Sequence, residues 1–215
     1  MQDREEILIY GAGGHGKAVI DLARACGYHV AALIDDGVAV GTRILDVEVV
    51  GGSESLHEWR QRGITRAANA VGGIGHPEVR QRVFELLESA GFSFPTLIHP
   101  RAFVEASAVL EEGVQVLALA YIGSDARLGF GAVINAGAIV SHDVILGRVT
   151  NLSPGAALAG GVQLGDLSQV GMNATINVNV QIGEQCIIGN GATVKTFVPY
   201  GTRVWAGSTW TLRRR

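Results

Sequence analysis

Residues 122–158 read IGSDARLGFGAVINAGAIVSHDVILGRVTNLSPGAAL, and this stretch repeats a pattern of six residues. An aliphatic residue stands at every sixth position, and the same phase holds from Ile98 to Val194. Four residues after each aliphatic comes a small or β-branched residue, from Ala102 to Val198. A period of six is neither the 3.6 of an α-helix nor the 2 of a β-strand. It predicts a parallel β-helix built of hexapeptide repeats.

In such a coil each aliphatic side chain points into a narrow prism, and the small residue fits inside at the corner. Three hexapeptides make one triangular turn, so residues 18 apart stack on the same face. We expect about six coils without an insertion between Ile98 and Val204. A prism of this kind has flat faces and no pocket of its own. We therefore expect a site where prisms abut, or against the N-terminal domain, and a cyclic homotrimer as the natural assembly.

The N-terminal part alternates expected strands with expected helices, which predicts a small parallel α/β sheet of Rossmann type. We expect an α/β domain over residues 1–94 and the β-helix over residues 95–215. The expected strands are 7–10, 30–34, 47–50 and 67–71, and the expected helices are 17–26, one capped by Ser53 that continues to Arg62, and one opened by 76–78.

Gly11-x-Gly13-x-x-Gly16 lies between the first expected strand and helix, which is the context of a dinucleotide-binding loop. Free N–H groups at a helix start bind phosphate. The domain is too short for two nucleotide-binding halves, which favours a nucleotide or nucleotide-sugar diphosphate over a nicotinamide cofactor. Turn glycines without a ligand are the remaining alternative. The candidate contacts are Gly13, Gly14 and His15 in this loop, with Asp35 and Asp36 after the second strand either on ribose or base or simply solvated.

Bulk composition excludes several classes of function. The net charge of −3 gives no electrostatic reason to bind nucleic acid or an anionic membrane. The two cysteines, Cys26 and Cys186, lie far apart, which suits a reducing cytoplasm and argues against a disulfide framework or a metal site. The charged N-terminus and the lack of a long apolar run predict no signal peptide and no membrane insertion. We expect a cytoplasmic protein.

Charged residues and histidines are scarce in the repeat, and Ser141-His142-Asp143 stands out among them. His142 is the third residue of its hexapeptide, an outward position. A neutral imidazole can take a proton from an attacking amine or hydroxyl, and Asp143 beside it can fix its tautomer and make it a better acceptor. The alternative is a surface histidine on a coil without a chemical role.

The order of these motifs resembles the sialic-acid O-acetyltransferase and nucleotide-aminosugar N-acetyltransferase family of left-handed β-helix enzymes. The motifs that carry the resemblance are the loop GAGGHGK, the run Ile34-Asp35-Asp36, Ile74-Gly75 before a helix with Arg80, Leu97-Ile98-His99-Pro100, and the hexapeptides with Ser141-His142-Asp143 and residues 153–162. The resemblance covers nearly the whole chain.

The resemblance implies acetyl-CoA as co-substrate and a nucleotide-diphospho-aminosugar as acceptor, held by the N-terminal domain, to which Gly75 belongs. It implies that His142 is the general base and Asp143 its helper, and that Asn135 contacts the sugar. Backbone N–H groups near Gly160, Met172 and Asn190 are expected along the pantetheine groove.

Two departures from the family pattern concern the acetyl-CoA end of the site. Asn151 stands where a second histidine is common, so it can donate a hydrogen bond but cannot titrate, or it is an ordinary turn residue. Trp205 and Trp210 flank Ala206-Gly207-Ser208-Thr209 where Gly-Val-Pro-Ala is usual, and they either cover an adenine or pack on the last coil.

The sequence thus predicts an acetyl-CoA-dependent N-acetyltransferase that acts on a nucleotide-linked aminosugar, with no acyl-enzyme intermediate because no cysteine adjoins His142. O-acetylation of a sugar or sialic acid is the first alternative. A non-catalytic hexapeptide protein that binds a nucleotide sugar is the second.

Overall fold

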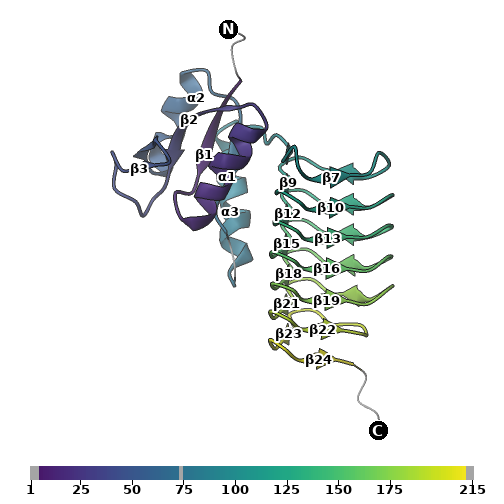
Figure 1. Cartoon of the computed structure of the whole chain (residues 1–215). Helices are drawn as coiled ribbons and strands as arrows, with labels where there is room; N and C mark the ends of the chain where they lie inside the picture. The colour runs from purple at the N-terminus through teal and green to yellow at the C-terminus, as the bar shows by residue number, and fades with distance from the viewer. Residues whose placement is uncertain (1–4, 73–74, 212–215) are drawn as a thin grey trace. The chain divides into compact units, whose positions relative to one another are not determined.

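The computed structural model describes residues 5–72 and 75–211 (Figure 1). The chain divides into two compact units, Met1–Leu97 and Ile98–Arg215. The expected order, an α/β domain followed by a parallel β-helix, is confirmed.

A five-stranded sheet forms the first unit, in the order β3-β4-β2-β1-β5. Its strands are β1 (Glu6–Tyr10), β2 (His29–Ile34), β3 (Arg43–Ile44), β4 (Val47–Gly51) and β5 (Ala67–Asn69). All pairs are parallel except β3–β4, a hairpin on one edge. The central strands are buried because their apolar runs, such as Ile7–Ile9, are covered on both faces.

The helices of this unit are α1 (Gly14–Ala25), the 3₁₀ turn η1 (Ser53–Ser55), α2 (Leu56–Gln61) and α3 (Pro77–Ser89). Two expectations were wrong in detail. The expected helix from Ser53 begins as a 3₁₀ turn without a capping bond from the serine side chain, and the carboxylate of Asp36 accepts the free N–H of Ser53. The strand expected over 67–71 ends at Asn69, whose side chain accepts the N–H of Val71 and turns the chain.

The second unit stacks two-residue strands into three parallel faces (Figure 1). Face 1 comprises β6 (Leu97–Ile98), β9 (Gln115–Val116), β12 (Val133–Ile134), β15 (Asn151–Leu152), β18 (Gln169–Val170), β21 (Ile187–Ile188) and β23 (Arg203–Val204). Face 2 comprises β7 (Phe103–Val104), β10 (Tyr121–Ile122), β13 (Ile139–Val140), β16 (Ala157–Leu158), β19 (Thr175–Ile176), β22 (Thr193–Val194) and β24 (Thr209–Trp210). Face 3 comprises β8 (Val109–Leu110), β11 (Arg127–Leu128), β14 (Ile145–Leu146), β17 (Gln163–Leu164) and β20 (Gln181–Ile182).

The interior follows the predicted hexapeptide rule. Repeat aliphatics such as Ile122 and Ile134 are fully buried, and so are the small residues four positions later, such as Ala126 and Ala138. Strand partners are 18 residues apart, as in Ile139 with Ala157. From residue 113 to residue 191 the third residue after each aliphatic takes a left-handed backbone conformation, which favours glycine, asparagine and aspartate there.

The repeat has no insertion as far as Val204, but its last coil is shorter than the hexapeptide period predicts. Ile182 bridges to Val198, 16 residues on, and Ile188 likewise pairs with Val204. Val198 therefore takes the place of a strand aliphatic, only four residues after Val194. The turn through Lys195–Phe197 is therefore two residues shorter than the repeat.

Candidate active site

His142 lies on the corner that joins face 2 to face 3, two residues after β13. Its Nδ1 is 2.7 Å from Oδ2 of Asp143, and its side chain is 67% exposed. The backbone of this corner is bonded to both neighbouring coils, since Asp143 N–H donates to Ser124 O and Gly161 N–H donates to His142 O. A rigid scaffold thus presents an exposed imidazole.

A carboxylate only accepts hydrogen bonds, so the His142 nitrogen that faces Asp143 carries the proton. Nε2 then keeps its lone pair and can accept a proton from a bound molecule. Asp143 holds φ +58°, a left-handed conformation that aspartate tolerates better than most residues. The pair therefore presents one ring nitrogen to solvent while the other is held by the carboxylate.

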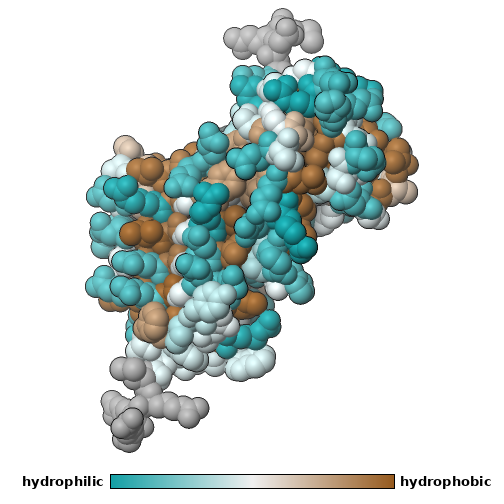
Figure 2. All heavy atoms as spheres, turned by 180° about the vertical axis from the view of Figure 1, so that it is seen from behind, coloured by the Kyte–Doolittle hydropathy of each residue, from teal (hydrophilic) through white to brown (hydrophobic). Residues whose placement is uncertain are grey.

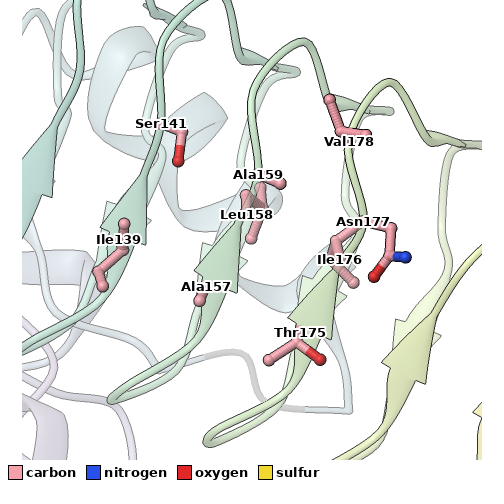
Figure 3. A pocket seen from close by; sticks show the side chains of 9 residues that line it. All are labelled: Ile139, Ser141, Ala157, Leu158, Ala159, Thr175, Ile176, Asn177 and Val178. Atoms are coloured by element: carbon pink, nitrogen blue, oxygen red, sulfur yellow. The ribbon is translucent and has the colours of Figure 1, made fainter.

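A groove of about 530 Å³ runs along face 2 beside this corner (Figure 3). Its floor is lowered by small side chains, Ala157 and Ala159, between the larger Ile139 and Val178. Ser141, adjacent to His142, lines one end, and the other lining residues are Leu158, Thr175, Ile176 and Asn177. The groove is shallow and open, and it forms because the outward residues of successive coils differ in size.

Four other residues predicted for the site lie around face 1 and the corner that leads from it to face 2. Asn135 donates through Nδ2 to Oδ1 of Asn151 at 3.1 Å and to Leu152 O at 2.8 Å. Asn190 accepts the Met172 N–H through Oδ1 at 2.9 Å. The chain brings these residues together in pairs, but face 2 separates them from His142. Gly160, one coil after His142, is the predicted residue that adjoins the imidazole.

The glycine-rich loop connects β1 to α1, and its glycines have two different roles. An added Cβ at Gly11 would lie 2.8 Å from the carbonyl carbon of Ala70, and one at Gly16 would lie 2.4 Å from Gly11 O. A Cβ at Gly13 or Gly14 would meet nothing within 4 Å. The outer glycines therefore serve packing, and the middle ones leave open space at the helix start, as a phosphate-binding loop requires.

The remaining loop candidate, His15, is half-buried on the first turn of α1. A Cβ at Gly72 would lie 3.6 Å from Cβ of His15. His15 therefore packs where the loop after β5 passes α1.

Both aspartates after β2 bind backbone. Asp35 accepts the N–H of Ala12 at 2.7 Å and that of Gly37 at 2.9 Å, which fastens the glycine-rich loop to the β2 end. Asp36 accepts the Ser53 N–H at 2.7 Å and the Tyr10 hydroxyl. These bonds, the Tyr10 bond first, lower the pKa of Asp36, while burial and the Asp36 carboxylate raise the pKa of Tyr10.

Beneath the loop that follows β5 lies a buried cation whose role the sequence did not reveal. Arg80, on α3, is 1% exposed and donates through Nη1 to the carbonyls of Asn69 and Val71, both at 2.8 Å. Asn69 returns a bond from Nδ2 to Arg80 O. Gly75, beyond this loop, has φ +80° and open space at its Cβ position. The sequence places Arg80 in a family motif, but nothing in a sequence marks an arginine as buried.

The comparisons with known proteins agree with this architecture. Residues 6–87 match the family model described as the PglD N-terminal domain. UDP-N-acetylbacillosamine N-acetyltransferase of Bacillus subtilis is 31% identical over 121 residues, which span 53% of this chain and about half, 52%, of that curated relative.

Solved structures match over nearly the whole chain. GDP-perosamine N-acetyltransferase of Caulobacter crescentus, in complex with CoA and GDP-perosamine, has a TM-score of 0.89 and 38% identity over 94% of both chains. The same enzyme with a histidine replaced by alanine matches equally. The acetyltransferase domain of PglB from Neisseria gonorrhoeae, in complex with acetyl coenzyme A, has a TM-score of 0.86 and 29% identity over 95% of this chain and 98% of that one. The chain belongs to the nucleotide-aminosugar N-acetyltransferase family of hexapeptide-repeat enzymes.

Within residues 5–72 and 75–211, no helix has the length and hydropathy needed to cross a membrane. In the same residues, no three histidine, cysteine, aspartate or glutamate side chains gather as metal ligands would.

Proposed function

We propose that this protein transfers the acetyl group of acetyl-CoA to the amino group of a nucleotide-linked 4-aminosugar. The observation that carries the proposal is the exposed His142–Asp143 pair beside a groove, in a chain 38% identical to an enzyme that binds CoA and GDP-perosamine. GDP is therefore the first nucleotide to test.

The reaction is a direct transfer. The sugar amine attacks the thioester carbonyl while Nε2 of His142 accepts its proton, and Asp143 holds the imidazole and stabilises its charged form. The tetrahedral intermediate then breaks its carbon–sulfur bond, and the departing thiolate takes the proton from the imidazolium. The products are the N-acetylated sugar nucleotide and free CoA thiol, so protons and electrons balance without a covalent enzyme intermediate.

The glycine-rich loop is proposed to bind the diphosphate. Gly13 and Gly14 expose backbone at the N-terminus of α1, where N–H groups and the helix dipole favour anions. Asp35 holds this loop through Ala12, so its contribution to binding is the shape of the loop. His15, Asp36 and Gly75 remain proposed contacts to the nucleotide sugar.

The groove on face 2 is proposed to hold the acyl end of acetyl-CoA. Gly160 adjoins the imidazole through its Cα side, and its backbone N–H is proposed to contact the thioester. The Met172 N–H donates to Oδ1 of Asn190, so acetyl-CoA can bind this N–H only if that hydrogen bond breaks. Oδ1 of Asn151 accepts from Nδ2 of Asn135, so an acetyl-CoA contact to this Asn151 oxygen would compete with Asn135. A sugar contact to Nδ2 of Asn135 would compete with the same hydrogen bond to Asn151.

A homotrimer is proposed as the assembly, since faces 2 and 3 expose apolar side chains on the N-terminal coils of the β-helix. Phe103, Tyr121 and Ile139 form a column on face 2, with the two rings stacked 6.0 Å apart, and Val109 and Ile145 lie outward on face 3. Figure 2 shows hydrophobic side chains between hydrophilic rows along the coils. Apolar patches of this kind mark protein contacts.

The test is an acceptor panel with purified protein. GDP-, UDP- and dTDP-linked 4-aminosugars are incubated with acetyl-CoA, and released thiol is measured. We expect release with an aminosugar, and loss of about 10²-fold or more in kcat for His142→Asn, because asparagine cannot accept the proton. His99→Asn, which replaces the other histidine of the repeat region, is the control and should keep activity.

The remaining outcomes decide between the alternatives. Release only with hydroxyl acceptors would show an O-acetyltransferase. Nucleotide-sugar binding without thiol release from any acceptor would show a non-catalytic binding protein.

A further inference from the structure

Glycines in the repeat fall into two classes with a structural cause, and one glycine belongs to neither. Glycines directly after the aliphatic lie close to the backbone of the next coil. A Cβ added to Gly123, for example, would lie 2.7 Å from the backbone nitrogen of His142. The class members are Gly123, Gly129, Gly147, Gly165, Gly171, Gly183 and Gly189. Those three after the aliphatic have left-handed φ, as Gly161 does at +69°. The members are Gly113, Gly131, Gly137, Gly155, Gly161, Gly191, Gly201 and Gly207.

Gly160 is the exception, two residues after Leu158. Its φ is outside the left-handed region, so its backbone does not require glycine. The three atoms nearest to an added Cβ all belong to the His142 ring: Cε1 at 2.4 Å, Nε2 at 2.5 Å and Nδ1 at 3.1 Å. Real Cβ contacts below 3.0 Å essentially never occur.

The coil itself also accepts a side chain at this position. In the same corner column, 18 residues apart, stand Ala106, Ser124, His142, Gly160 and Val178. Val178 shows that even a β-branched residue fits the corner one coil later. Neither backbone conformation nor coil packing therefore explains the glycine, and the imidazole does.

We propose that Gly160 is a positioning residue for His142: its missing side chain lets the imidazole lie across the next coil with Nδ1 on Asp143. A Cβ would push the ring away and break or bend the 2.7 Å bond to the carboxylate. Nε2 would then leave the position from which it reaches the acceptor amine. This inference rests on the proposed role of His142 as the base.

Gly160→Ala and Gly160→Val test it by steady-state kinetics. We expect kcat to fall about tenfold or more for alanine and further for valine, since a displacement near 1 Å can cost about 10²-fold. KM for the sugar nucleotide should stay within about twofold, because the nucleotide-binding loop is untouched. Ala106→Val adds the same bulk to the same column two coils away and should leave kcat unchanged.

A double variant separates this role from a direct contact with acetyl-CoA. If Gly160 acts through the imidazole, Gly160→Ala in a His142→Asn background causes no further loss. Equal losses in both backgrounds overturn the inference, as does full activity of Gly160→Val. If His142→Asn alone retains full kcat, the proposed function fails instead.

Nuclear magnetic resonance gives a readout that does not depend on activity. The ring nitrogens of His142, assigned by comparison with His142→Asn, should report the Nδ1–H tautomer in the native protein. That signal should change in Gly160→Ala while thermal unfolding stays the same. An unchanged His142 signal in Gly160→Ala overturns the inference even if kcat falls.

Discussion

Replacing Arg80 by methionine removes the donor that holds the loop after β5 and keeps most of the side chain's apolar volume. Arg80 is 1% exposed, and its Nη1 lies 2.8 Å from the carbonyl oxygens of both Asn69 and Val71. Burial lowers the pKa of Arg80 to about 9, which still leaves it charged at neutral pH. The bonds that the variant loses are therefore charge-assisted.

The magnitude follows from the two carbonyls. A buried acceptor left without its donor costs about 1–3 kcal/mol, so the two carbonyls cost at most about 6 kcal/mol, and less because that of Val71 is only part-buried. Part of this loss of unfolding free energy is offset, because the folded variant no longer carries the desolvation cost of a buried guanidinium. We expect the first unit to lose about 2–4 kcal/mol of unfolding free energy.

Tryptophan fluorescence can measure the two units separately. Trp59 belongs to the first unit, and Trp205 and Trp210 belong to the β-helix. With the latter two replaced by phenylalanine, urea unfolding reports on the first unit. Arg82→Met, on the exposed side of the same helix, is the control and should change stability by less than about 0.5 kcal/mol.

The same variant has a functional consequence. The loop that Arg80 holds packs on the glycine-rich loop, since Gly11 adjoins Ala70 and Val71. Arg80→Met should therefore raise KM for the sugar nucleotide more than it changes kcat. A loss of stability below about 0.5 kcal/mol, or one equal to that of Arg82→Met, would refute the reasoning.

Three further predictions concern single side chains. The pKa of Asp36 is lowered in the folded state, so Asp36 stabilises the fold above its unfolded pKa, and this stabilisation is lost as the pH falls through its folded pKa. Tyr10→Phe removes the main cause of the shift and should weaken this pH dependence of the unfolding free energy, measured from pH 7 downward. Leu119 is 63% exposed at φ +63°, so Leu119→Gly should raise stability by about 0.5–1 kcal/mol, and an unchanged melting temperature would contradict this. Asp143→Asn should leave the melting temperature unchanged, because asparagine tolerates φ +58°, but should lower kcat by about tenfold or more; retention of full kcat would remove Asp143 from the mechanism.

The sequence predicted the β-helix well because its signal is repeated in every coil. Val198 shows where that signal fails. It meets the rule for a small residue four after Val194 and also the rule for the next aliphatic, so the pattern does not reveal that the corner is two residues short. Only the pairing of Ile182 with Val198 decides between them.

Contacts between coils were partly predictable, since residues 18 apart stack. The contact of Gly160 with His142 follows from that spacing, and Asn135 and Asn151 fall on adjacent positions of neighbouring coils. The burial of Arg80 does not follow from any period. It depends on carbonyl groups at the end of β5, whose direction the local sequence does not determine.

The corner of His142 also shows how a repeat fold can acquire chemistry without an insertion. From residue 113 to residue 191 the third position of every corner is left-handed, and Asp143 meets that requirement while its carboxylate orients the imidazole. The fold and the proposed reaction therefore both depend on the same residue. At Gly160 the repeat requires nothing, and a glycine there weakens rather than strengthens the coil. A residue that the fold does not need, placed against a candidate base, is best explained by the chemistry of that base.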